Sequence, residues 1–162
     1  MAWAKLATNT LTGTTDPINI TFTETKFIQT LSHDLPTTTR IQPQIEFNSD
    51  GASTNYAARY SINGGADATQ TSTASGRYGA GTTVDWEFIV GYIINIATEE
   101  KLMISFCIYG SDAATNAPSR QETVTKWANT ANQINEIDDD NEDTGDYGGY
   151  ATGSNLTALG TD

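Results

Sequence analysis

The strongest constraint on the fold is an alternation of side chains over residues 82–98. A repeat of two residues places successive side chains on opposite faces of an extended strand. The second half of this stretch is apolar at both parities, which is typical of a central strand covered on both faces. After the turn at residues 98–100, a second apolar run covers Lys101–Gly110. The two runs predict a long antiparallel hairpin. The residues of one parity in the first run are Val84, Trp86, Phe88, Val90, Tyr92 and Ile94.

Similar alternation recurs along the rest of the chain. Residues 17–23 place Ile18, Ile20 and Phe22 on one face, and residues 40–48 form a strand in which Pro43 indicates an edge position or a bulge. Clusters of Gly, Asn, Asp and Ser separate further strand-like runs at 121–129, 132–138 and 154–160. We count eight to ten strands and no helix. The chain 1–162 is therefore predicted to be a single all-β domain, an antiparallel β-sandwich, with a jelly roll favoured over other sandwiches.

Composition narrows the classes of partner. Thr, which sits well on the solvated face of a sheet, accounts for 27 of the 162 residues. The net charge of −12 repels phosphate backbones, so we expect no nucleic acid partner. No run approaches the ~20 apolar residues of a membrane span, and the N-terminus has no apolar signal segment. The single cysteine, Cys107, lies in an apolar run and is predicted to be a buried, inert thiol.

Residues that would support catalysis are scarce, and we predict that the protein is not an enzyme. One His and one Cys cannot supply the ligands of a zinc site, and no Ser stands in a Gly-x-Ser-x-Gly motif. His33 is interpreted as a surface residue at the end of a strand. Carboxylates are abundant enough for glycosidase chemistry, but no pair stands out in the sequence.

The densest acidic segment is Glu136–Asp146, in which seven of eleven residues are acidic. Asp139, Asn141 and Asp143 have the alternate spacing of oxygen ligands in a calcium loop, so they form a candidate Ca²⁺ site. The alternative is a solvated strand end and hairpin tip. No other cofactor is predicted.

Candidate interaction residues lie in segments rich in turn-forming residues. Tyr78, Tyr147 and Tyr150 occupy Gly-rich loops, where they can stack on sugars, anchor protein contacts or pack over the end of the sandwich. Tyr56 and Arg59 belong to a structured connection whose tip is free to contact a neighbour. Arg59 can pair with an acidic loop of an adjacent subunit or remain exposed to solvent.

Two segments resemble known viral proteins. Phe47–Asp67 is similar to a pattern in structural proteins of tailed phages and related marine viruses, where a strand ending in Phe-Asn leads to Asp, Gly, Ser and then Asn-Tyr. Lys126–Gly160 resembles a C-terminal pattern of phage fibre-like and decoration-like sandwich domains. The chain departs from that pattern in its acidic insert, Asp138–Asp143. The resemblance implies a virion structural protein with a jelly-roll-like fold, and it supplies no catalytic residues.

Three functions follow as hypotheses. The first is a virion structural protein, a capsid decoration or fibre-type subunit that is made in the host cytoplasm and assembles with copies of itself and with a particle scaffold. Symmetric homo-oligomers are the usual form of such proteins, and a trimer suits a jelly roll. The second is a carbohydrate- or receptor-binding module that recognises a host glycan. The third is a hydrolase with converging carboxylates in a cleft.

Overall fold

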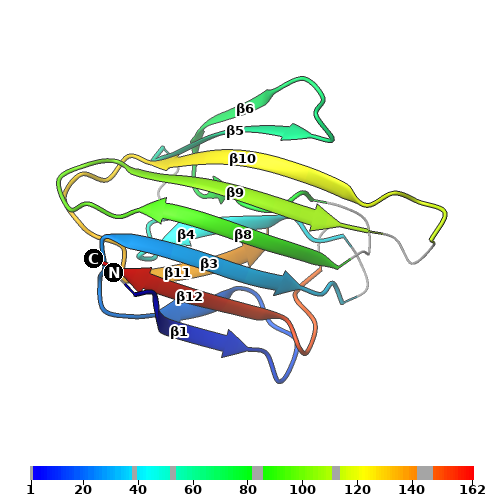
Figure 1. Ribbon diagram of the computed structural model, residues 1–162, viewed down its shortest axis with the longest axis horizontal. Helices are drawn as coiled ribbons and strands as arrows, with labels where there is room; N and C mark the ends of the chain where they lie inside the picture. The colour runs from blue at the N-terminus through cyan, green and yellow to red at the C-terminus, as the bar shows by residue number, and fades with distance from the viewer. Residues whose placement is uncertain (1, 38–39, 52–53, 82–85, 111–113, 142–147) are drawn as a thin grey trace.

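The computed structural model describes residues 2–37, 40–51, 54–81, 86–110, 114–141 and 148–162 (Figure 1). These residues form twelve β-strands and contain no helix, and so none long and apolar enough to cross a membrane. The all-β prediction is confirmed, with more strands than the eight to ten expected. The strands are β1 (Ala4–Thr10), β2 (Ile18–Thr21), β3 (Phe27–Asp34), β4 (Pro43–Phe47), β5 (Tyr56–Ile62), β6 (Ala68–Thr73), β7 (Gly76–Arg77), β8 (Glu87–Ile94), β9 (Lys101–Tyr109), β10 (Ser119–Trp127), β11 (Glu136–Asn141) and β12 (Asn155–Thr161).

The strands form two antiparallel sheets that stack as a sandwich. The large sheet has eight strands in the order β1-β12-β3-β8-β9-β10-β5-β6, and the small sheet has four in the order β2-β11-β4-β7. In Figure 1 the large sheet faces the viewer and β4 and β11 lie behind it. A simple jelly roll has eight strands in all. The jelly-roll assignment therefore stays a prediction, while the antiparallel two-sheet arrangement is shown.

The predicted central hairpin is confirmed. β8 and β9 pair from Glu87 opposite Tyr109 to Ile94 opposite Leu102. They occupy the middle of the large sheet, with β3 on one side and β10 on the other. Cys107 on β9 is buried, as the sequence predicts.

An aromatic cluster fills one end of the space between the sheets. The ring of Trp127, on β10, lies 5.7 Å from that of Phe47 and is stacked against that of Tyr56 at 6.4 Å, measured between centroids. The backbone N–H of Phe47 donates to the Tyr56 hydroxyl at 2.8 Å, which ties the small sheet to β5 of the large one. Isoleucines of the small sheet, among them Ile18, complete the core.

Two local predictions need correction. Residues 56–62, expected to be part of a connection, form β5, which is paired with β10 on one side and β6 on the other. Hydrogen bonding on both sides makes this segment a full member of the large sheet. Pro43 lies neither at a sheet edge nor at a bulge. It is the first residue of β4, an interior strand of the small sheet, and a first position tolerates the missing N–H.

Candidate interaction surface

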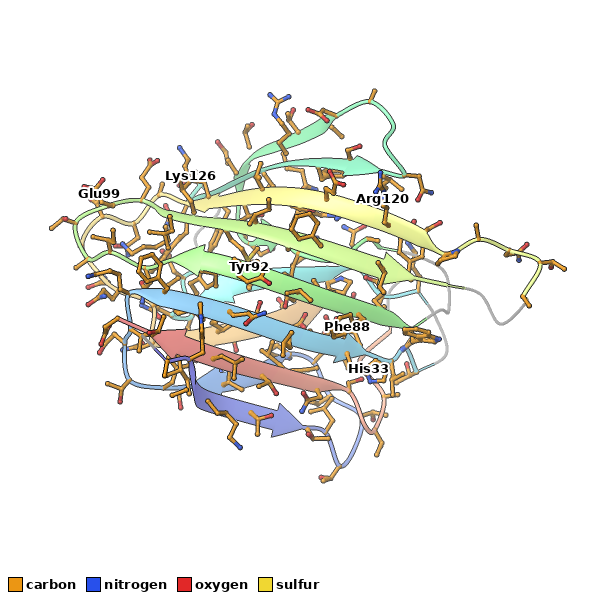
Figure 2. The ribbon with its side chains drawn as sticks, viewed as in Figure 1. His33, Phe88, Tyr92, Glu99, Arg120 and Lys126 are labelled. Atoms are coloured by element: carbon orange, nitrogen blue, oxygen red, sulfur yellow. The ribbon has the colours of Figure 1, made fainter. Side chains whose placement is uncertain are left out.

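The outer face of the large sheet carries a continuous group of exposed apolar side chains. It is the face turned away from the small sheet, and Figure 2 looks directly onto it. The group spans the central strands β8, β9 and β10, and each member is 36–52% exposed. We call the following eight residues the apolar face: Phe88, Tyr92, Ile94, Leu102, Ile104, Phe106, Ile108 and Val124.

The alternation of β9 shows how the chain builds this face. Leu102, Ile104, Phe106 and Ile108 are exposed, whereas the residues between them are buried against the small sheet. A fully exposed large side chain offers about 200 Å², so eight at these exposures present roughly 700 Å². The largest apolar patch on a typical monomer is about 300–600 Å², and larger patches mark interaction sites. The face is therefore our candidate functional site.

One end of the face is hollowed into a trough of about 920 Å³. Its floor crosses the strands and includes Tyr92, Ile94, Leu102, Ile104 and Val124. Trp3 lines it beside β1, and residues 69–71 of β6 line it at the opposite edge of the sheet. Among the described residues, its lining includes no carboxylate. The lining also includes the cations Arg59 and Lys126 and the polar residues 69–71, so the apolar part of the trough is its floor across β8, β9 and β10.

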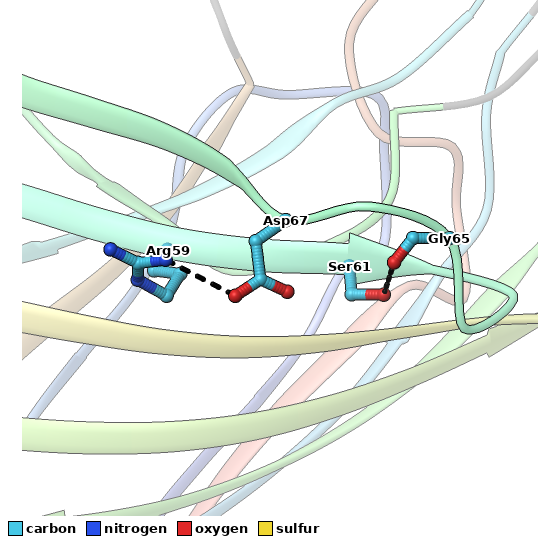
Figure 3. A network of polar contacts seen from close by, with 4 residues as sticks. All are labelled: Arg59, Ser61, Gly65 and Asp67. Carbon is cyan, nitrogen blue, oxygen red and sulfur yellow. Dashed lines mark hydrogen bonds and ion pairs between the residues drawn. The ribbon is translucent and has the colours of Figure 1, made fainter.

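Ion pairs along β5 and β10 compensate the cations beside the apolar face. Arg59 contacts Asp67 at 3.2 Å, and Figure 3 shows this pair next to the Ser61 hydroxyl, which donates to the carbonyl of Gly65. Two further pairs are Lys126 with Glu100 at 3.3 Å and Arg120 with Glu122 at 3.9 Å. Figure 2 shows Lys126 and Arg120 at opposite ends of β10. Each of these cations has a carboxylate of its own, so this flank of the face carries little net charge.

The outward side of the small sheet is strongly acidic instead. Glu46 lies directly opposite Asp138 in the register of β4 and β11. Glu136 and Asp140 share the parity of Asp138 along β11. Burial, with the charges of Asp138 and Asp140, raises the pKa of Glu46, and burial likewise raises the pKa of Asp138. The carboxylates of Glu46, Glu136, Asp138 and Asp140 are therefore grouped on the side opposite the apolar face.

A second concentration of carboxyl groups is buried between the sheets. Asp34 at the end of β3, Glu87 at the start of β8 and Asp139 on β11 are all fully buried. Ser32 Oγ lies 2.6 Å from Asp139 Oδ2 and in close contact with Asp34 Oδ1. The Tyr150 hydroxyl donates to Asp139 Oδ1 at 2.8 Å.

The geometry requires a shared proton. The Ser32 hydroxyl has one hydrogen, so it can donate to one carboxylate only. Its contact with the second carboxyl therefore needs a proton on Asp34 or Asp139. Burial, followed by the charge of Asp139, raises the pKa of Asp34 well above its usual value. Burial raises the pKa of Asp139 to about 7. The cluster thus links two carboxyl groups through one serine in the sealed interior.

Two of the three calcium candidates have partners inside the protein. Asp139 and Asn141 point inward from β11, and Asn141 Oδ1 accepts the backbone N–H of Gln42 at 2.6 Å. The side-chain amide of Asn141 donates to the carbonyl of Gly148. Asp143 lies outside the described residues. Across the part of the chain that the structure describes, no group of three or more His, Cys, Asp or Glu side chains could hold a metal ion.

The predicted interaction residues divide into buried and exposed positions. Tyr56, Tyr78 and Tyr150 belong to the core, so the packing alternative applies to the two loop tyrosines Tyr78 and Tyr150. Tyr78 binds Thr30, with 3.0 Å between the two hydroxyl oxygens. Tyr147 lies outside the described residues. Arg59 is exposed, and its carboxylate partner comes from the turn after its own strand.

Sequence reasoning missed both the apolar face and the carboxyl cluster. The signal for the face was present, because β8 is apolar at both parities, but we interpreted it only as typical of a central strand. The signal for the cluster was weak. Asp34 follows a histidine and Asp139 lies in an acidic run, and only the fold brings the two together.

Comparison of the chain with protein-family models and with curated proteins returns no match.

Proposed function

We propose that this protein is a structural subunit of a virus particle, of the capsid decoration or fibre type, that assembles with copies of itself and with a particle scaffold. The observation that supports it best is the apolar face. Eight large apolar side chains stand exposed on β8, β9 and β10, the central strands of the larger sheet. Covering such a surface with another protein is favourable, because it removes apolar area from water.

The chemistry of the face favours binding over transformation of a substrate. A hydrolytic site needs acid and base groups that converge on an accessible cleft. Among the described residues, the carboxyl groups of Asp34, Glu87 and Asp139 converge but are fully buried, and those of Glu46 and Asp138 lie on the outward side of the small sheet, away from the trough. The trough, by contrast, has no carboxylate among its described lining residues, which combine Ile, Leu, Val and aromatic side chains with Thr, Gln and the cations Arg59 and Lys126. The proposal accordingly assigns the protein a mechanical role.

A glycan-binding module is the second candidate, and the aromatic rings of Trp3 and Tyr92 in the trough are the observation that favours it. Aromatic faces stack on sugars, but sugar recognition also needs hydrogen-bonding groups placed around the ring. The aliphatic floor of Ile94, Leu102 and Ile104 offers none, and hydrogen-bonding side chains of the lining such as Arg59 and Gln70 stand toward the β5–β6 edge. Binding on a glycan array that is lost in Tyr92→Ala would favour the module over the structural subunit.

The test of the proposed function is the location of the protein. Antibodies raised against the purified chain would be used for immunogold labelling of virus particles whose genome encodes it. We expect regularly spaced labels on the capsid or tail. Particles that carry no label, while the protein is found elsewhere in the infected culture, would contradict the proposal.

A further inference from the structure

We infer that two copies of this chain pack their apolar faces together about a two-fold axis, with the strands of the two copies antiparallel across the interface. The inference deepens the proposed function by naming the partner of the apolar face as a second copy of the chain. It differs from the trimer expected for a jelly roll. Area, charge and shape each support it.

The area of the face matches that of a stable interface. The eight exposed side chains present roughly 700 Å² at about 200 Å² each when fully exposed. A standard protein interface buries about 800 Å² on each partner. Face-to-face packing of two sheets is also the ordinary way in which apolar sheet surfaces are covered, with the sheets about 10 Å apart.

The distribution of charge favours a second copy as the partner. With a net charge of −12, two copies repel each other in most orientations. The apolar face avoids this repulsion, because Arg59, Arg120 and Lys126 on its flank are already paired with carboxylates. The acidic residues Glu46 and Asp138 lie on the small sheet, on the far side of the sandwich. Pairing through the large sheets therefore holds the two acidic sides as far apart as the molecule allows.

The shape of the face selects the antiparallel arrangement. The trough lies at the end of the strands marked by Ile94 and Leu102. Phe88, Phe106 and Ile108 stand exposed at or toward the other end and do not line it. A two-fold axis in the interface, perpendicular to the strands, exchanges these ends. The three side chains of each copy then cover the trough of the other, whereas a parallel arrangement would set one hollow over another.

The first experiment compares self-association of the wild-type protein with that of two variants by sedimentation velocity over a range of concentrations. Ile104→Glu places one charge in the centre of the apolar face of each copy, so the pair buries two. We expect this variant to raise the dissociation constant of the pair about 30-fold or more. Ile62→Glu is the matched control. Ile62 is 38% exposed, but it lies opposite Gln121 and so shares the inward parity of that buried residue. We expect this control to associate like the wild type.

Circular dichroism and a thermal melt would accompany the sedimentation runs, because the monomer fold should survive a substitution at an exposed position. A wild-type protein that stays monomeric, or a pair that persists in a folded Ile104→Glu variant, would overturn the inference.

The second experiment tests the arrangement by chemical cross-linking of the thiols of single-cysteine additions. Leu102 and Ile108 lie six residues apart on β9, about 20 Å along a strand. Sheets packed face to face lie about 10 Å apart, which exceeds the Cα separation of roughly 7 Å that a disulfide allows, so a short bis-maleimide reagent is used to join the two thiols. The antiparallel pair therefore predicts cross-linking when Leu102→Cys and Ile108→Cys are mixed. It predicts little cross-linking in either variant alone. The wild type, whose Cys107 is buried, is the control.

Cross-linked Ile108→Cys pairs without mixing would show the parallel arrangement, and an absence of cross-links in every sample would contradict face-to-face packing. These results are separable from the location test. A monomer that labels particles would refute the pairing alone, and a pair that is absent from particles would refute the proposed function alone.

Discussion

The two faces of the large sheet differ from the usual distribution of polarity, because the inner face mixes polar groups with core residues such as Trp127 and the outer face is unusually apolar. The face turned toward the small sheet carries many buried polar groups, including Thr30, Ser105 and Gln121. The face turned to solvent carries Tyr92, Phe106 and the rest of the apolar face. In an antiparallel sheet with one solvated side, polar residues are expected outside and apolar ones inside. The apolar side chains of the outer face indicate that it is built to be covered, while hydrogen bonds allow part of the inner face to be polar.

The inner polar groups bind one irregular segment of backbone. The hydroxyl of Thr125 donates to the carbonyl of Arg77 at 2.7 Å, that of Ser105 to Tyr78 at 3.1 Å, and the amide of Gln121 to Gly79 at 2.8 Å. Buried carbonyls outside a regular ladder need such partners. The polar inner face therefore holds residues 77–79 in place between the sheets, a task that apolar side chains could not perform.

Truncating one aromatic residue on each face gives the largest expected contrast. Trp127 on β10 faces inward and is fully buried, so Trp127→Ala should lower the free energy of unfolding by about 3–5 kcal/mol. Phe106→Ala on β9, whose side chain is exposed, should lower that of the monomer by about 1 kcal/mol or less. Urea titrations at low protein concentration would measure both. Equal losses would refute the distinction between the faces.

The buried carboxyls predict an unusual dependence on pH. Asp139, with a pKa raised from 3.8 to about 7, holds its proton in the folded protein across a range where the unfolded chain has lost it. The pKa of Asp34 is raised in the same direction. Stability from this source is complete below about pH 4 and is lost as the pH rises through about 7. Acidification from pH 7.5 to pH 5 should therefore raise the free energy of unfolding by a few kcal/mol.

The groups facing this carboxyl pair are Glu87, Cys107, Tyr78 and Tyr150, and none of them supplies a positive charge. Asp139→Asn, which resembles the protonated acid, should flatten the pH profile in chemical denaturation, because burial of Asp139 raises the pKa on which the profile depends. A profile that stays steep in this variant would assign the effect to other carboxylates, such as Asp16, whose pKa burial and Asp140 raise to about 7.

Removing the hydroxyl between the two carboxyls should have a smaller effect. Ser32→Ala leaves Asp34 and Asp139 without their common partner, and we expect a loss of about 1–3 kcal/mol in the free energy of unfolding at neutral pH. The control is Thr157→Ala, on the outward parity of the neighbouring strand β12, with an expected change within about 0.5 kcal/mol. An unchanged stability of Ser32→Ala would show that this hydroxyl does not couple the carboxyls.

The smallest effect is expected at the flank of the apolar face. Arg59 and Asp67 are both more than half exposed, so Arg59→Gln should change the free energy of unfolding by less than about 1 kcal/mol. Because it also leaves Asp67 uncompensated, self-association of this variant should become more sensitive to salt. Sedimentation at low and high ionic strength would measure this, and identical behaviour of variant and wild type would show that the pair does not influence assembly.

The sequence predicted the strands better than it predicted their environment. The hairpin of β8 and β9 and the buried Cys107 follow from periodicity and local hydrophobicity, which are properties of short segments. The burial of Tyr78 and Tyr150 could not be predicted in this way. Both stand among glycines in segments that look like surface loops, and only the stacking of the small sheet on the large one covers them.

The alternating side chains by themselves determined that this chain forms extended antiparallel strands, because the parity of a residue along a strand is a local property. Which parity faces the other sheet was decided by the tertiary structure. The reason is that β8 is apolar at both parities, so hydrophobicity alone favours neither side. The hydrogen bonds that the polar side chains of β9 and β10 make to residues 77–79 can form only when those side chains face inward. That requirement leaves the apolar face outside.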